Sequence, residues 1–187
     1  MLAGICYMPV VRNKLLKRFL VSEYTDLVFL DADIGWNPKD LVRLLLHDKD
    51  VVAAAAPFRA NPEGYPSSLI MKDGKIVQED GLLESAIAAT AFMRIRKQVF
   101  GLFIEEFGEK LIISEKNAKE EETDRYLNIF DTGQIGDKWW GEDTRFCDVY
   151  RKLGGRIWID PEIPLTHTGT HTWSGHFGDF LRRNGHL

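Results

Sequence analysis

DLVFLDADIGWNP, residues Asp26–Pro38, contains an apolar run over residues 27–30 that ends in two carboxylates one residue apart. Because its apolar residues are continuous rather than alternating, the run is typical of a strand buried on both faces. Asp31 and Asp33 follow at the carboxyl end of this strand, which is where ligands bind in open α/β sheets. Two carboxylates there offer oxygen ligands to a divalent cation, and such a cation binds a diphosphate. A turn that the two aspartates merely cap is the alternative interpretation.

The segments on either side alternate between helical and strand patterns. From Arg12 the apolar residues recur at helical spacing. Asn37 and Pro38 are typical of an N-cap and of the first residue of a helix, and a second continuous apolar run covers residues 51–56. The order helix, strand, helix, strand predicts an α/β fold with a mostly parallel sheet flanked by helices.

The remaining segments are predicted from local patterns. We expect a hairpin with an Asp-Gly turn over residues 69–77, strands over 87–95 and 156–160, a helix over 96–103 and a helix from Glu142. Residues 114–125, SEKNAKEEETDR, carry many charges and no apolar period, so we expect a mobile loop. A lid over the site is the alternative for this segment, because long loops are often functional. No repeat or linker divides the chain, and we expect a single domain over residues 1–187.

The composition excludes several classes of protein. A formal net charge of −4 gives no support to a nucleic-acid-binding surface. No apolar run approaches the ~20 residues of a membrane span, and the N-terminus lacks the basic and long apolar regions of a secretory signal. Cys6 and Cys147 are too few for a disulfide framework, which is typical of a reducing compartment. We therefore expect a cytoplasmic protein with no membrane span and no nucleic-acid partner.

Three further groups of residues are candidates for chemistry. Glu142 and Asp143 lie in a predicted first helical turn, where carboxylates either stabilise the helix dipole or present a general base. Trp139 and Trp140 precede them, and these indoles either stack on a sugar of the acceptor or belong to the core. His167 is either a hydrogen-bonded surface residue or a metal ligand, and the D-x-D earlier in the chain favours the metal role.

Taken together, these motifs resemble those of the GT-A glycosyltransferases, and most closely the family-2-like and viral or phage-encoded members. The resemblance rests on Arg12-Asn13 at the opening of a helix, FLDADIGWNP, AFMRI at 91–95, GEDTRFCDVYRKLGG at 141–155 and the H-x-G that begins at His167. It runs over most of the chain, to about Trp173. It implies a GT-A-like fold and a metal-dependent enzyme that transfers a sugar from a nucleotide diphosphate donor to an acceptor hydroxyl.

The resemblance also implies a role for each matching residue. The implied ligands of Mn²⁺ or Mg²⁺ are Asp31, Asp33 and His167. The implied donor-binding residues are Arg12, Asn13, Asp31 and Asp33. Asp143 is the implied catalytic base, with Glu142 beside it. The family begins with a strand-helix-strand-helix unit that binds the nucleotide base, whereas eleven residues precede Arg12 here. We therefore expect an N-terminally truncated form of the fold, with an open sheet edge that a homo-oligomer would cover. The alternative function is a non-catalytic, glycosyltransferase-like binding or structural module.

Overall fold

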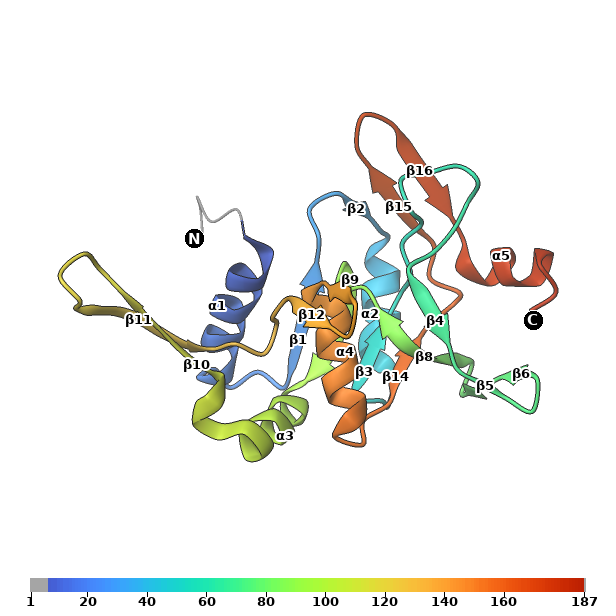
Figure 1. The fold of residues 1–187 in the computed structure, drawn as a ribbon. Coiled ribbons are helices and arrows are strands. Elements are labelled where there is room, and N and C mark those ends of the chain that lie inside the picture. Colours follow the sequence, from blue (N-terminus) through green and yellow to red (C-terminus); the bar gives the residue numbers. More distant parts are fainter. Residues whose placement is uncertain (1–6, 187) are drawn as a thin grey trace.

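The computed structural model describes residues 7–186. Its main sheet has the strand order β1-β9-β3-β14-β8-β4, and a short strand, β7, also pairs with β8 (Figure 1). The bounds of these strands are β1 Asp26–Leu30, β3 Val51–Ala53, β4 Ser67–Leu69, β7 Gln78–Glu79, β8 Leu82–Ala88, β9 Phe92–Arg96 and β14 Ile157–Ile159.

The prediction of a mostly parallel, GT-A-like sheet is wrong. The pair β3 and β14 is parallel, and every other pair in the main sheet is antiparallel. The strand predicted over residues 87–95 is in fact two strands, β8 and β9, which β3 and β14 separate in the sheet. Continuous apolar runs record burial on both faces, and burial does not specify the direction of a neighbouring strand.

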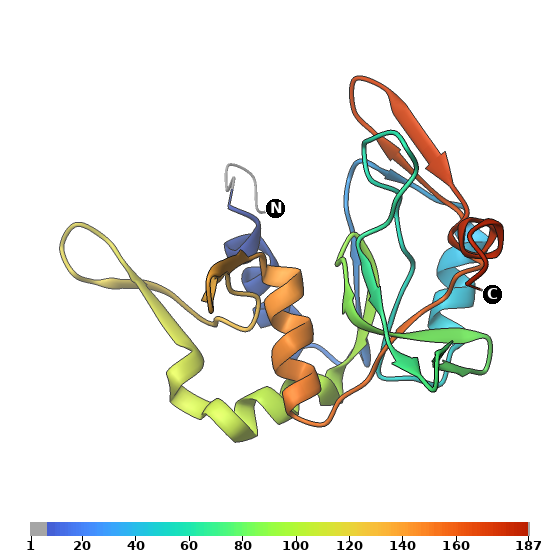
Figure 2. The same cartoon turned by 45° about the vertical axis from the view of Figure 1, so that its right-hand side comes forward.

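Helices cover both faces of the sheet. The side chains of Val51 and Ala53 face a cluster built with α1 (Met8–Leu20), α3 (Lys97–Phe107) and α4 (Glu142–Lys152). Those of Val52 and Ala54 face a second cluster that includes Leu44 of α2 (Pro38–Leu46). Figure 2 shows α4 and α2 on opposite sides of the sheet. This alternation explains why residues 51–54 are apolar without interruption.

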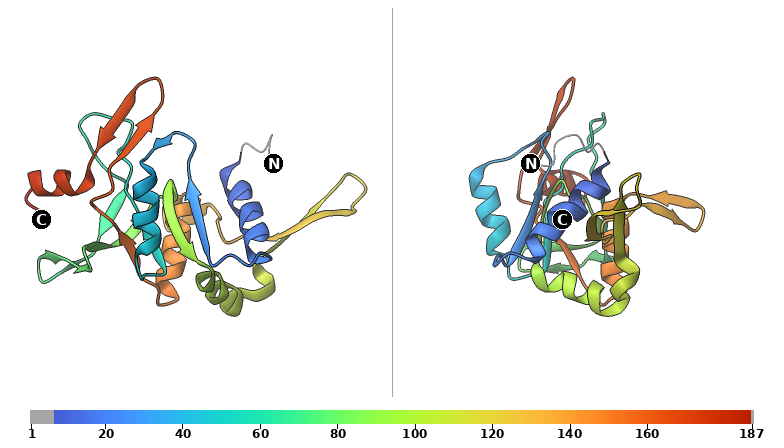
Figure 3. Two further views of the ribbon diagram at one scale, coloured as in Figure 1. Left: turned by 180° about the vertical axis from the view of Figure 1, so that it is seen from behind. Right: turned by 90° about the vertical axis from the view of Figure 1, so that its left-hand side faces the viewer.

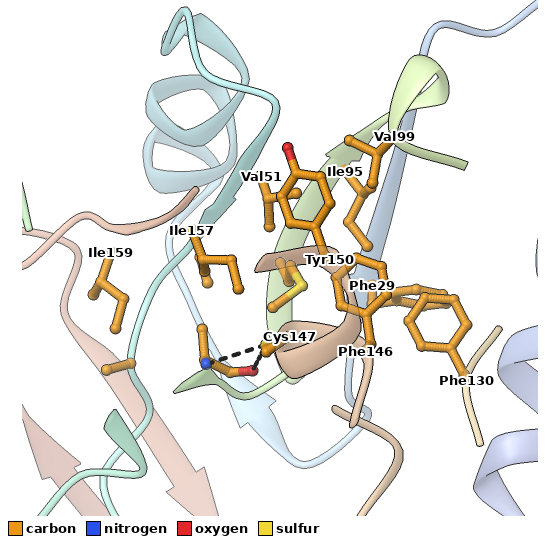
Figure 4. Close-up of a cluster of buried hydrophobic side chains, with 14 of the residues drawn as sticks. Phe29, Val51, Ile95, Val99, Phe130, Phe146, Cys147, Tyr150, Ile157 and Ile159 are labelled. Carbon is orange, nitrogen blue, oxygen red and sulfur yellow. Dashed lines mark hydrogen bonds between the residues drawn. The ribbon is translucent and has the colours of Figure 1, made fainter. Parts of the chain in front are cut away.

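The larger cluster is aromatic. The ring of Phe146 in α4 stacks on Phe103 of α3 and on Phe130, with centroids 5.6 and 5.0 Å apart. Cys147 lies beside it, and its Sγ is 3.5 Å from the backbone oxygen of Ala88 (Figure 4). Cys147 is a free, buried thiol, and Cys6 lies outside the described residues.

Local signals place several elements as predicted. The side chain of Asn37 accepts a hydrogen bond from Lys39 N, and Asp40 completes a capping box at the start of α2. Asp73 and Gly74 both have positive φ angles between β5 (Met71–Lys72) and β6 (Lys75–Ile76), as a tight Asp-Gly turn requires. Helix α1 begins earlier than predicted, at Met8.

The charged segment 114–125 is not the mobile loop that its composition predicted. It forms most of a hairpin, β10 (Ile112–Lys116) and β11 (Glu122–Leu127), which projects from the rest of the molecule (Figures 1 and 3). Glu115 and Asp124 lie directly opposite each other, and the ammonium group of Lys14 is 2.7 and 3.1 Å from their carboxylates. The lysine offsets the repulsion between two carboxylates that would otherwise destabilise this pairing.

Smaller elements complete the chain. They are β2 (Ile34–Gly35), β12 (Gly133–Ile135), β13 (Lys138–Trp140), β15 (Leu165–Thr168), β16 (Thr172–Gly175), the 3₁₀ helix Gly108–Leu111 and α5 (Phe177–Arg183). Strands β16, β15 and β2 form a separate three-stranded sheet, so that β2 joins the end of β1 to the β15–β16 hairpin. Among the described residues, no helix is long and apolar enough to cross a membrane.

Candidate functional site

The carboxyl ends of three strands meet at one edge of the main sheet. β1 and β3 are both antiparallel to β9, and β14 is parallel to β3, so these three strands run in the same direction. A cleft of about 810 Å³ opens at this edge, between α1, β1 and the first turn of α4. Five residues predicted for the site line it, namely Arg12, Asp31, Asp33, Glu142 and Asp143.

The D-x-D turn holds its own shape through the backbone. Ile34 N–H donates to the carbonyl oxygen of Asp31, and Asp31 N–H donates to that of Ala91, over 3.1 and 2.9 Å. Among the described residues, neither aspartate side chain accepts a hydrogen bond from a backbone N–H group. The two carboxylates therefore do not cap the turn, and 30% of the Asp31 side chain and 39% of the Asp33 side chain are exposed.

Arg12 connects two of the carboxylates that line the cleft. Its Nη2 is 3.3 Å from Asp31 Oδ1, and its Nε donates to Glu142 Oε1 over 3.1 Å. The guanidinium also lies over the ring of Phe29, and the side chain is 6% exposed. A buried guanidinium can hold two carboxylates from separate segments in a fixed geometry because its donors are planar and rigid.

Asp143 lies in the first turn of α4, beside Glu142. Its Oδ1 accepts a hydrogen bond from Thr144 N over 2.7 Å. Burial raises the pKa of the Asp143 carboxyl, and the neighbouring charge of Glu142 adds to the increase. A carboxylate with a raised pKa is a stronger base, which suits removal of a proton from a hydroxyl group.

His167 faces Asp33 from the neighbouring β15 strand. His167 pairs with Ile34 in the sheet, and its Nε2 is 3.5 Å from Asp33 Oδ2. The other ring nitrogen, Nδ1, is 2.9 Å from the carbonyl oxygen of Pro57. With the proton on Nδ1, the Nε2 lone pair points toward the carboxylate, which is the orientation that metal-binding histidines take.

Asp33 and His167 supply only part of the donor set that a divalent cation needs. Within residues 7–186, no group of three or more histidine, cysteine, aspartate or glutamate side chains is arranged to hold a metal ion. Asp33 and His167 provide two donors that face each other, whereas Asp31 pairs with Arg12. Mg²⁺ is often bound by one or two carboxylates together with substrate phosphates, and a partial set of this kind suits it.

Arg59 contacts the same carboxylate, and the sequence did not single it out. Its guanidinium forms an ion pair with Asp33 Oδ2, the oxygen that faces His167. Arg59 follows Pro57 just beyond the carboxyl end of β3. Apolar residues and Pro57 stand between the end of β3 and Arg59, so the rule that identified Asp31, a polar residue directly after a buried strand, does not find Arg59.

Three predicted residues lie away from this group. Asn13 is 1% exposed, and its amide binds Asn128 Oδ1 and Phe130 O while its oxygen accepts from two backbone N–H groups. These four bonds satisfy the amide nitrogen and oxygen of Asn13 inside the protein, so its side chain supports the fold around Asn128 and Phe130. Trp139 and Trp140 belong to β13, outside the lining of the cleft, and Trp139 is 73% exposed. Neither indole is packed in the core, and a role in acceptor binding stays a prediction.

Comparisons with known proteins add little. The chain matches no protein family, and no curated protein is similar to it. Among solved structures, A197 from STIV is similar with a TM-score of 0.48 and 16% identity, over 88% of this chain and 69% of that chain. A likeness at that level establishes neither the fold nor the function of this chain.

Proposed function

We propose that the cleft transfers a sugar from a nucleotide diphosphate donor to an acceptor hydroxyl. The observation that carries the proposal is the meeting of Asp31, Asp33, Glu142 and Asp143 around one cleft, although the chain separates the two pairs widely. A helix dipole by itself explains Glu142 and Asp143, and turn capping was the local explanation for Asp31 and Asp33. They do not explain why both pairs line the same cleft.

Asp143 is the base in this proposal. It takes the proton of the acceptor hydroxyl as that oxygen bonds to the anomeric carbon of the sugar, and the bond from that carbon to the diphosphate breaks. The raised pKa of Asp143 supports this role. Arg12 keeps Glu142 and Asp31 in place beside the reacting groups through its two ion pairs.

Mn²⁺ or Mg²⁺ is the proposed cofactor. Asp33 and His167 would hold it, and Asp31 would contribute through a bound water. When bound, such an ion neutralises charge on a departing diphosphate. The hydrogen bond from His167 to Pro57 O supports this assignment, because it leaves Nε2 free to act as a ligand.

Isothermal titration tests the proposal. The chain is titrated with a panel of nucleoside diphosphates, with and without Mn²⁺, and transfer is then assayed with the matching sugar nucleotides. We expect binding that requires Mn²⁺ and that Asp33→Asn and His167→Ala both abolish. Asp73→Asn is the matched control, because Asp73 is exposed in the β5–β6 turn at a positive φ that asparagine tolerates.

Two results would count against the proposal. A correctly folded chain that binds none of the diphosphates would exclude the donor site. Metal-dependent binding without transfer, unchanged by Asp143→Asn, would favour a non-catalytic binding module instead.

A further inference from the structure

Arg59 has a position that the proposed function does not use. It extends from a loop whose base is closed by a hydrogen bond from Phe58 N–H to Gly64 O over 2.8 Å. The same loop is tied to α5 by an ion pair between Glu63 and Arg183. The Arg59 side chain passes the β15–β16 turn, where a Cβ on Gly169 would lie 3.6 Å from its Cδ, and it ends at Asp33. The loop is therefore anchored at its base, while 43% of the Arg59 side chain is exposed.

Arg59 and His167 both face the same oxygen atom of Asp33. Asp33 Oδ2 contacts the guanidinium of Arg59 and lies 3.5 Å from Nε2 of His167. A divalent cation held between Asp33 and His167 would occupy this space, and it would repel the guanidinium at such short range. The cation and Arg59 therefore compete for the same carboxylate.

Arg12 and Arg59 differ in how many carboxylates each one binds. Arg12 is buried and binds Asp31 and Glu142 at the same time. Asp33 is the one carboxylate that Arg59 pairs with among the described residues. Once a cation displaces it, the Arg59 guanidinium has donors free for another anion at the same place.

Given the proposed function, we infer that Arg59 exchanges partners, from Asp33 in the ligand-free site to the diphosphate of the donor in the loaded site. A guanidinium binds phosphate oxygens with two parallel hydrogen bonds, which makes it a suitable ligand for a diphosphate. The same side chain then weakens binding of the cation alone and strengthens binding of the cation together with the diphosphate.

The test measures the two ligands separately. Free Mn²⁺ is titrated by electron paramagnetic resonance without nucleotide, and nucleoside diphosphate is then titrated calorimetrically at saturating Mn²⁺. For Arg59→Gln we expect Mn²⁺ to bind about 2- to 5-fold more tightly, the effect of losing one partly exposed ion pair. We expect the diphosphate to bind at least about tenfold more weakly, the effect of losing charge-assisted hydrogen bonds.

Controls separate this inference from the proposed function. Arg59→Lys keeps the positive charge but loses the planar guanidinium that can form two parallel hydrogen bonds. Its affinity for the nucleoside diphosphate should lie between those of the wild type and Arg59→Gln. Arg18→Gln removes an exposed arginine of α1 and should change neither affinity. General damage to the fold would weaken the binding of both Mn²⁺ and the diphosphate. An exchange of partners by Arg59 instead changes the two affinities in opposite directions.

Each outcome has a definite meaning. Opposite shifts in Arg59→Gln support the exchange. Mn²⁺ binding that depends on Asp33 but is unchanged in Arg59→Gln, with unchanged diphosphate affinity, overturns the exchange and leaves the proposed function standing. No Mn²⁺ binding by either the wild type or Arg59→Gln, both without nucleotide and with saturating nucleoside diphosphate, overturns both.

Discussion

Replacement of Arg12 by methionine should destabilise the protein strongly, although methionine can still pack on Phe29. The variant loses the ion pairs to Asp31 and Glu142 and leaves two carboxylates without a cation. Removing one partner of a buried ion pair costs about 3–5 kcal/mol. The Asp31 and Glu142 side chains are 30% and 17% exposed, so water replaces part of the lost interaction. We therefore expect a loss of about 2–3 kcal/mol in the free energy of unfolding, or about 4–12 °C in Tm.

The chain contains a matched control for this prediction. Arg156 also binds two carboxylates, those of Glu79 and Glu84, and also lies over an aromatic ring, that of Trp158. Its side chain is 47% exposed, compared with 6% for Arg12. Exposed pairs contribute little, so Arg156→Met should cost less than about 1 kcal/mol.

Urea unfolding monitored by circular dichroism measures both variants. Adding Glu142→Gln to Arg12→Met should recover part of the loss, because it neutralises one of the stranded carboxylates. The reasoning from burial is refuted if Arg156→Met loses as much stability as Arg12→Met, or if Arg12→Met unfolds at the wild-type urea concentration.

Three further predictions concern titratable groups. Burial raises the pKa of Asp143, so ionisation of this group lowers stability as pH rises above its ordinary value of 3.8. Asp143→Asn should therefore exceed the wild type in Tm at pH 7 and lose that advantage in acid, as measured by calorimetry across pH. Hydrogen bonds from Lys17 and Lys14 lower the pKa of Asp124 to about 2. The ionised carboxylate therefore stabilises the fold above pH 3.8, and this stabilisation is lost as pH falls toward 2. Protection of the β10–β11 amides from hydrogen exchange should fall over that range in the wild type but not in Asp124→Asn. Burial raises the pKa of the Cys147 thiol to about 12, so peptide mapping after alkylation at pH 8 should find it unmodified until urea unfolds the chain.

The sequence predicted elements whose signals are local. The capping box of Asn37 and Asp40 and the turn at Asp73-Gly74 depend on residues within one turn of each other, and the structure confirms both. The β10–β11 hairpin could not be predicted in this way. Its opposed carboxylates at Glu115 and Asp124 are neutralised by a lysine 101 residues from Glu115, and no local pattern records that contact.

The candidate site shows the same division. Polar residues directly after an apolar run identified the D-x-D, and an acidic first turn identified Glu142 and Asp143. Arg12 and Asn13 were assigned as a pair, but consecutive residues of a helix point about 100° apart, so one reaches the cleft and the other enters the core. The direction of each strand, which decides what meets at the edge of the sheet, depends on pairings that the spacing of apolar residues does not contain.

Burial also explains why two arginines of one site can have different roles. Arg12 and Arg59 each pair with an aspartate of the D-x-D, but their side chains are 6% and 43% exposed. A buried guanidinium cannot leave its carboxylates without leaving charges unpaired in a poorly solvated place, so Arg12 acts as a fixed support. An exposed ion pair is worth about 1 kcal/mol or less, so a cation can displace Arg59 at little cost. The difference in exposure, rather than the type of residue, makes Asp33 the exchangeable position of the site and Asp31 the fixed one.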